Sequence, residues 1–410
     1  MRGKEKGVLS MPLGWIDFSK SERNKVLSVL ELLSEKGTLD ELGIAPIRDG
    51  FAERFFPGTS TIQTRAKYFL IVPYALKELE RSGDSNPASV LRAFDQMERS
   101  CAEMFLAKNQ DEAGVIGKRS LSGGRWVKRT PADIYWAGLR RYGIFVGGKL
   151  SLAEYVRASC AEKGRKQNLL RLGSRRDRAE EFEVDDPDAG DCRRTRFWNL
   201  PLEQKGWQDS LQIELTPAEG AFLKERIISS CPGSMMAFIL RNHRRDILEL
   251  EEFQALAPLM DGFPSQIRED YDLALAFSDF LFVLRTIYNL IVSNGKNAEA
   301  NETWAILEPS LREFSEVDLE NIFNRLHITD LRLRRFLARS RHLMENGDTE
   351  SMRQEIIRRE EELKGPARAK TRHPEQNDHS QWYGGRALDY RFRNARTILR
   401  DIFESEGPLC

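Results

Sequence analysis

Residues 386–403 read RALDYRFRNARTILRDIF, and the apolar side chains of this stretch recur with the period of an α-helix. These side chains are Leu388, Phe392, Ala395, Leu399 and Ile402, at successive intervals of 4, 3, 4 and 3 residues. This spacing places all of them on one face of a helix, beside several arginines. We therefore predict an amphipathic helix over residues 386–403 that buries its apolar stripe in a helical core.

The same period, with residues that cap helix ends, recurs along most of the chain. Thr130 and Thr216 each precede a proline and, three residues on, an acidic side chain, which is typical of a helix start. Further helices are predicted over 19–37, 64–81 (with a kink or break at Pro73), 87–107, 151–160, 234–248, 267–293, 302–314, 316–326, 329–346 and 349–363. Strand candidates are short, at 143–146 and 211–215. We predict a mainly α, multi-helical fold with little β structure.

A change in composition divides this array of helices. Between residues 162 and 196 apolar residues are few, and a run of basic side chains is followed by a run of acidic ones. Such a segment cannot bury a core and is expected to be exposed. We predict two helical domains, 1–160 and 197–410, joined by a charged linker or long loop over 161–196.

The composition limits which kinds of binding surface and which cellular environment fit this chain. The chain has 410 residues, of which 40% are hydrophobic, and 63 Lys+Arg balance 63 Asp+Glu, so a nucleic-acid surface must be a local patch. The most apolar run, Leu273 to Val292, contains Asp279 and Arg285, which favours a buried helix over a membrane span. The 5 cysteines are far apart and form no C-x-x-C pair. We expect a cytoplasmic protein without membrane contact.

Motifs for catalysis or metal binding are not recognisable. The glycine-rich stretch 114–119 lacks phosphate-loop spacing, and no G-x-S-x-G sequence occurs. His373 and His379 share a polar loop with Glu375 and Asp378, for which the alternatives are a metal site and an ordinary solvated loop. We expect no catalytic residue, cofactor or metal ion, although a nuclease with an unrecognised carboxylate site stays open as an alternative.

Basic clusters are the positive functional signal. Several arginines and lysines gather in residues 118–142, near 332–341 and in 364–400, in part beside aromatic residues. Guanidinium groups and aromatic rings suit phosphates and unstacked bases. The alternative is that these residues lie on solvated helix faces or form intramolecular ion pairs. The predicted nucleic-acid-binding residues are Arg65, Lys67, Arg125, Lys128, Arg129, Arg140, Arg141, Arg335, Arg339, Arg393, Arg396 and Arg400.

The N-terminal third contains distinctive motifs. Residues 14–19 read GWIDFS, residues 56–69 read FPGTSTIQTRAKYF, and residues 131–139 read PADIYWAGL. With residues 40–49 and 114–117, these motifs resemble a family of uncharacterised bacterial proteins, densely over residues 14–145. The resemblance implies an association with prokaryotic defence loci, near helicase and phospholipase-D-like nuclease genes. It implies no activity and no catalytic residue.

The segment 59–65 gathers hydroxyl groups and Arg65 before an apolar helix, and helix N-termini bind anions readily. Plain helix capping is the alternative. Together these observations favour a non-catalytic component of a prokaryotic antiviral defence system. We expect it to bind DNA or RNA, a helicase or nuclease subunit, or both. The alternative from a different class is a helical protein-interaction scaffold without affinity for nucleic acid.

Overall fold

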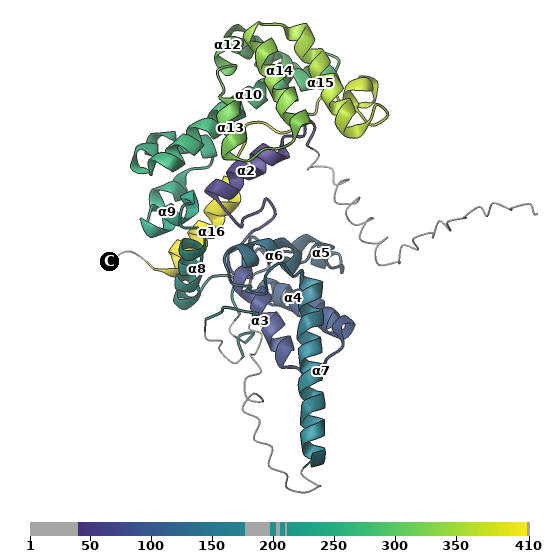
Figure 1. Ribbon diagram of the computed structural model, residues 1–410, viewed down its shortest axis with the longest axis vertical. Coiled ribbons are helices and arrows are strands. Elements are labelled where there is room, and N and C mark those ends of the chain that lie inside the picture. The colour runs from purple at the N-terminus through teal and green to yellow at the C-terminus, as the bar shows by residue number, and fades with distance from the viewer. Residues whose placement is uncertain (1–39, 177–196, 202–205, 210, 408–410) are drawn as a thin grey trace, which may run out of the picture.

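The computed structural model describes residues 40–176, 197–201, 206–209 and 211–407, and most of this chain is helical. The predicted mainly α fold is confirmed. Figure 1 shows two groups of helices, a lower lobe and an upper lobe, connected by a set of helices that we call the junction. The GWIDFS motif and the helix predicted over 19–37 lie outside the described residues.

The lower lobe consists of α3 (Tyr68–Arg81), α4 (Pro87–Lys108), α5 (Lys118–Ser122), α6 (Pro131–Arg141) and α7 (Leu152–Arg176). Helix α3 packs against α4 and α6, and α7 crosses α4 (Figure 1). Pro73 lies inside α3 without breaking it. The residues from Tyr68 to Leu76 are all buried, so tertiary packing maintains the helix despite the missing backbone donor.

The upper lobe is built around one long helix. Its helices are α10 (Ser265–Val292), α11 (Ala298–Leu307), α12 (Leu311–Phe314), α13 (Leu319–Arg325), α14 (Leu331–Glu345) and α15 (Thr349–Lys364), with a short 3-10 turn, η4 (Glu308–Ser310). By length and composition α10 is long and apolar enough to cross a membrane, but 67% of its most apolar window is buried. Packing against α11, α12 and α15 therefore accounts for its apolar sequence.

The junction combines segments from both ends of the described chain. It contains α2 (Ala45–Phe55), α8 (Pro217–Ser230), α9 (Met235–Arg241), η2 (Arg245–Glu249), η3 (Phe253–Gly262) and α16 (Phe392–Ser405). Helix α2 contacts α9 and α10, and the rings of Phe51 and Phe55 lie 5.7 and 6.0 Å from that of Tyr390. Part of the predicted N-terminal domain 1–160 thus packs among helices of the predicted domain 197–410.

Capping confirms several predicted helix starts and corrects one. Thr130 and Thr216 both form capping boxes at the first turns of α6 and α8. The last helix, however, begins at Phe392 and not at residue 386, because Tyr390 and Arg391 adopt the left-handed conformation (φ of 48° and 67°). Leu388 is still buried, but it reaches the core from the preceding loop.

Two other boundaries differ from the sequence prediction. Helix α7 continues to Arg176, into the segment predicted as a linker, because this stretch is rich in residue types that favour helix, such as Lys, Arg, Gln and Leu. The residues 40–61, which look turn-rich in sequence, contain α2, whose Pro46 lies in the first turn where its missing donor is tolerated.

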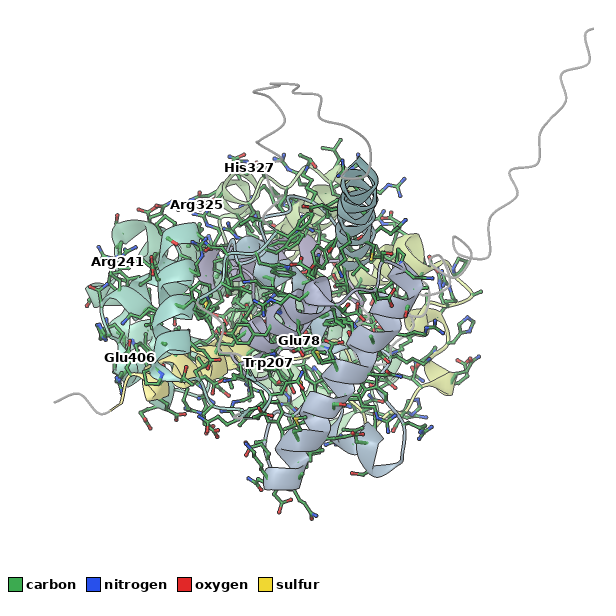
Figure 2. All side chains as sticks on the ribbon, turned by 90° about the horizontal axis from the view of Figure 1, so that it is seen from below. Glu78, Trp207, Arg241, Arg325, His327 and Glu406 are labelled. Carbon is green, nitrogen blue, oxygen red and sulfur yellow. The ribbon has the colours of Figure 1, made fainter. Side chains whose placement is uncertain are left out.

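Neither strand candidate forms a strand. Residues 143–146 contribute a single antiparallel bridge, between Phe145 and Trp198, and 211–215 form a bend. A segment this short needs a partner strand to be stable. The bridge brings residues 197–200 onto the lower lobe, where Trp198 packs on Trp136 with ring centroids 5.9 Å apart. Figure 2 shows a second such attachment, in which Trp207 Nε1 donates to Glu78 at 2.9 Å.

A buried carboxylate on α16 connects the junction to the lower lobe. Asp401 accepts hydrogen bonds from Arg65 Nε at 2.9 Å and from the Ala66 backbone N–H at 2.7 Å. Two residues after Arg65, the Lys67 side chain forms a second ion pair, in which Nζ lies 2.7 Å from the buried Glu219 of α8. These ion pairs hold the start of α3 against two junction helices.

We expect Asp401→Asn to lower the free energy of unfolding by about 3 kcal/mol, because it leaves the charge of Arg65 in a site of low exposure without its main partner. Urea denaturation of both proteins measures this difference. The exposed Asp272 of α10 offers a matched control, and Asp272→Asn should change stability by no more than about 0.5 kcal/mol. Equal effects of the two substitutions would contradict the structural role of Asp401.

A second prediction concerns Glu98 of α4, which accepts a hydrogen bond from the Ala132 backbone N–H at 2.7 Å. Burial raises the pKa of this carboxyl to about 8 from its usual 4.5, so the folded state binds a proton that the unfolded state releases. Its contribution to stability is full below pH 4.5 and is lost as the pH rises to about 8, at about 1.4 kcal/mol per pH unit.

We expect Glu98→Gln to remove this pH dependence while keeping a carbonyl acceptor for Ala132. The difference in unfolding free energy between variant and native chain should grow in favour of the variant from pH 5 to about pH 8. Denaturation curves across this range measure it, with the exposed Glu345→Gln as control. A pH-independent difference would show that Glu98 is ionised in the folded protein at every pH tested.

Candidate nucleic-acid interface

Arg65 and Lys67 do not lie on a nucleic-acid surface. Besides Asp401, the Arg65 guanidinium approaches Glu112, with 3.3 Å from Nη1 to Oε1. Lys67 is only 4% exposed and its ammonium is paired with Glu219. Both charges are neutralised by carboxylates inside the fold, so these two residues have internal partners in place of the predicted contacts with phosphate. Between the open alternatives for this helix start, anion binding and structural capping, the geometry favours a structural role.

The arginines of α16 also have intramolecular partners. Arg400 Nη2 donates to the Leu248 carbonyl at 2.9 Å, and Arg396 Nη1 donates to the Leu250 carbonyl. These bonds fix α16 to the end of η2. Arg393 is exposed, with Asp389 3.9 Å away. Arg396 and Arg400 therefore hold a helix in place, and their guanidinium groups bind backbone carbonyls where contacts with phosphate were predicted.

The arginines of α14 lie in the upper lobe, away from those of the lower lobe (Figure 1). Arg339 pairs with Glu355 at 2.9 Å, and Arg334 pairs with Glu320 at 2.8 Å. Arg335 is exposed and forms no ion pair within the described chain. The predicted basic residues thus do not converge on one groove, since they are divided among the two lobes and the junction.

At the end of α6 the two arginines differ. Arg140 is exposed, on the solvent side of the helix with Asp133 and Ala137. Arg141 faces the junction, where its Nε lies 4.0 Å from Glu53 of α2. That carboxylate also accepts a hydrogen bond from Arg391 at 2.6 Å, so Arg141 takes part in a contact between the lobe and the junction.

In the lower lobe one predicted cluster remains accessible, and we call it the α5–α6 basic surface: Arg119, Arg125, Lys128 and Arg129. All four side chains are exposed, within a stretch of 11 residues that runs from α5 to the residue before Thr130, the N-cap of α6. Arg119, Arg125 and Arg129 have no ion-pair partner among the residues that the structure places. Their charges are therefore open to an external anion.

Local packing gives this surface a defined shape. The Arg125 backbone N–H donates to the Ser120 carbonyl at 2.9 Å, and Trp126 Nε1 donates to Asp95 of α4 at 3.0 Å. Gly117 adopts a φ of 91°, and a Cβ there would lie 2.6 Å from the Trp126 ring. Trp126 thus packs directly over the backbone of a residue that has to be glycine.

The polar loop that contains the histidines is explained by internal contacts. His373 Nε2 lies 3.2 Å from the Pro366 carbonyl, and His379 Nε2 lies 2.8 Å from the Pro374 carbonyl. This loop includes two short 3-10 turns, η5 (Lys370–Arg372) and η6 (Pro374–Gln376). In the described ranges of the chain no three His, Cys, Asp or Glu side chains gather as a metal site would require.

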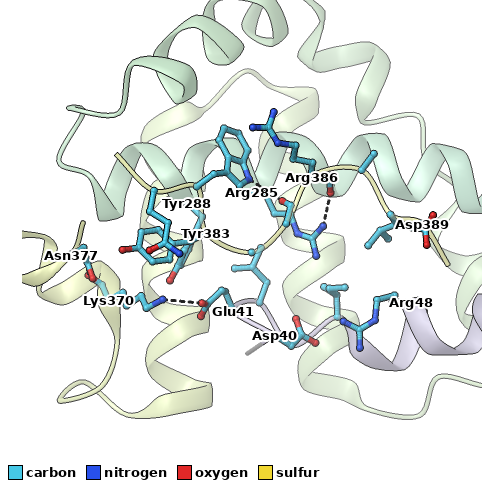
Figure 3. A pocket seen from close by; sticks show the side chains of 18 of the residues that line it. Asp40, Glu41, Arg48, Arg285, Tyr288, Lys370, Asn377, Tyr383, Arg386 and Asp389 are labelled. Carbon is cyan, nitrogen blue, oxygen red and sulfur yellow. Dashed lines mark hydrogen bonds and ion pairs between the residues drawn. The ribbon is translucent and has the colours of Figure 1, made fainter. Parts of the chain in front are cut away.

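A cavity of about 770 Å³, not predicted from the sequence, lies between the start of the described chain, α10 and the loop that precedes α16 (Figure 3). Arg285 of α10 lines it, with Trp382 and the glycines Gly384 and Gly385. A charged residue in the middle of an otherwise apolar run was the available signal. It served only to exclude a membrane span, because nothing in the local sequence indicates what surrounds Arg285.

Comparison with known proteins identifies one match. Residues 10–170 match a family of unknown function, DUF6361, and this range contains α2, all the lower-lobe helices up to residue 170 and the α5–α6 basic surface. No curated protein and no solved structure matches the chain. The predicted resemblance to an uncharacterised family is therefore confirmed over residues 14–145, the segment that carries the motifs.

Proposed function

We propose that this protein contacts nucleic acid through the α5–α6 basic surface, as a non-catalytic component of a prokaryotic antiviral defence system. One observation carries the proposal. Arg119, Arg125 and Arg129 are exposed and have no carboxylate partner in the described residues, whereas Arg65 and Lys67 are paired inside the fold and the exposed Arg339 is paired with Glu355. Unpaired guanidinium groups on an exposed loop are suited to the phosphates of a nucleic-acid backbone.

The mode of binding follows from the residue types. Contacts to phosphate neutralise backbone charge and release counterions, so affinity should fall steeply as the salt concentration rises. The surface contains no extended basic helix that could enter a groove, and Trp126 is already occupied with Asp95 and Gly117. We therefore propose binding to the backbone with little preference for sequence.

The place in a defence system rests on the resemblance of the N-terminal motifs to a family found near helicase and nuclease genes. With few phosphate contacts on this chain, affinity for nucleic acid alone would be modest. A helicase or nuclease subunit that binds the same strand would add its own contacts and raise the overall affinity. The α5–α6 basic surface would then orient the strand for a partner that performs the chemistry.

We expect the triple substitution of Arg119, Arg125 and Arg129 by alanine to weaken binding at low salt. Each lost phosphate contact should reduce the slope of log K against log[salt] by about 0.7 to 0.9, hence about 2 to 3 in total. Fluorescence anisotropy with labelled single-stranded DNA, single-stranded RNA and duplex DNA across a salt series measures both quantities.

A matched control removes three exposed arginines of the upper lobe, Arg332, Arg335 and Arg341, which have no ion pair in the described structure. This control should bind like the native chain. Equal loss in the two triple variants would mean that net charge and not the α5–α6 basic surface determines binding. Absence of binding by the native chain at low salt would favour the alternative of a protein-interaction scaffold.

A further inference from the structure

A second feature, remote from the α5–α6 basic surface, is the cavity of about 770 Å³ beside α10. Its walls come from three parts of the chain: the segment from Asp40 to Arg48, the middle of α10, and the loop from Lys370 to Asp389 (Figure 3). A volume of this size is within the range of about 300 to 1,000 Å³ that is typical of small-molecule sites.

Arg285 is the unusual residue of this cavity. It rises from the middle of α10 and donates from Nη1 to the Arg386 carbonyl at 2.7 Å. No carboxylate in the described chain lies within ion-pair distance of it, and desolvation lowers the pKa of its guanidinium to about 10. A half-buried cation without a counter-ion is unfavourable, so the site is electrostatically incomplete.

The other basic residues of the wall are already neutralised. Lys370 Nζ lies 3.3 Å from Glu41, and Arg48 pairs with Asp49 at 3.1 Å. Arg386 forms an ion pair with Glu299. Among the described residues of the cavity wall, Arg285 is therefore the cation whose charge is not balanced by a carboxylate and is available to a ligand.

The acidic groups of the wall also have donors within the protein. Asp40 accepts a hydrogen bond from the Ala45 backbone N–H, at the start of α2, and its charge acts on Arg285 only from a distance. Asp389 accepts from the Arg393 backbone N–H at 3.3 Å. Both retain acceptor capacity, which hydroxyl groups of a ligand could use.

The part of the loop that lies beside Arg285 consists of two glycines and therefore presents its backbone, without side chains, to the cavity. Gly384 and Gly385 have φ values of 81° and 75°, a conformation that side chains rarely adopt, and a Cβ on either would lie 3.8 Å from an atom of Arg285. Their N–H groups donate no hydrogen bond within the described residues, so they are available to an oxyanion. Trp382 and Tyr383, which come directly before these glycines, line the same wall and contribute apolar surface to the cavity.

We propose that this cavity binds a phosphate-bearing small molecule of nucleotide size, with the phosphate on Arg285. The phosphate supplies the negative charge that Arg285 lacks, and the Gly384–Gly385 backbone permits close approach of phosphate oxygens. The volume exceeds what a phosphate ion needs, so an organic part fills the remainder. Hydroxyl groups on that part, as in a nucleotide or a sugar phosphate, complement Asp40 and Asp389.

Isothermal titration calorimetry on the full chain tests the proposal with four probes: an equimolar mixture of the four ribonucleoside 5′-monophosphates, the corresponding nucleosides, ribose 5-phosphate and inorganic phosphate. We expect the phosphorylated organic probes to bind and the nucleosides not to bind. Stronger binding of the nucleotide mixture than of ribose 5-phosphate identifies a nucleotide, and the reverse order identifies a sugar phosphate. Binding of inorganic phosphate as tight as that of both, or no binding of any probe, would overturn the proposal.

Substitution assigns the binding to Arg285. Arg285→Met, similar in length and uncharged, should weaken binding of the phosphorylated probe at least tenfold, because a charge-assisted contact is lost. It should also raise the melting temperature of the ligand-free protein, since an uncompensated charge is removed. Arg386→Met, which removes a neutralised cation of the same wall, is the matched control and should bind normally.

Arg285→Lys retains the charge and should bind with intermediate affinity, which keeps the test decisive if the methionine variant does not fold. Native affinity in both Arg285 variants would overturn the proposed role of this residue. These measurements use small probes only, so their outcome is independent of binding at the α5–α6 basic surface.

Discussion

The arrangement of the whole protein depends on the ion pair between Arg65 and Asp401. A single carboxylate on α16 receives the Arg65 side chain and the Ala66 backbone N–H, just before α3 begins. Lys67 and Glu219 repeat the contact with α8. The lower lobe is therefore positioned by buried polar contacts, whose geometry is more specific than that of apolar packing.

Burial divides the arginines of this chain into two populations. Those in or against the junction, such as Arg65, Arg396 and Arg400, bind carboxylates or backbone carbonyls and connect segments that are distant in sequence. Those on the α5–α6 basic surface lie within residues 10–170, the range that is similar to the DUF6361 family, and extend into solvent. Arg285 belongs to neither population, because it is half-buried and still lacks a carboxylate partner in the described chain.

Local features of the sequence were sufficient to predict most helices. The capping boxes at Thr130 and Thr216 fix helix starts through contacts within four residues, and the structure has both. The start of α16 could not be predicted, because it depends on where Tyr390 meets α10 and not on the apolar period. The roles of the arginines were harder to predict than the helices. Arg125 is exposed, whereas Arg400 holds α16 in place through a hydrogen bond to a backbone carbonyl, and only their neighbours in the folded chain distinguish the two residues.

The junction also affects the order in which the chain can acquire structure. Phe51 and Phe55 meet Tyr390, and Arg65 meets Asp401 across a separation of 336 residues. Contacts of such long range carry a large loop-closure cost and slow the folding of domains that rely on them. During synthesis the lower lobe can associate early, whereas α2 cannot complete its aromatic contacts until residues 388–403 leave the ribosome. That interval gives a chaperone a defined apolar segment to protect.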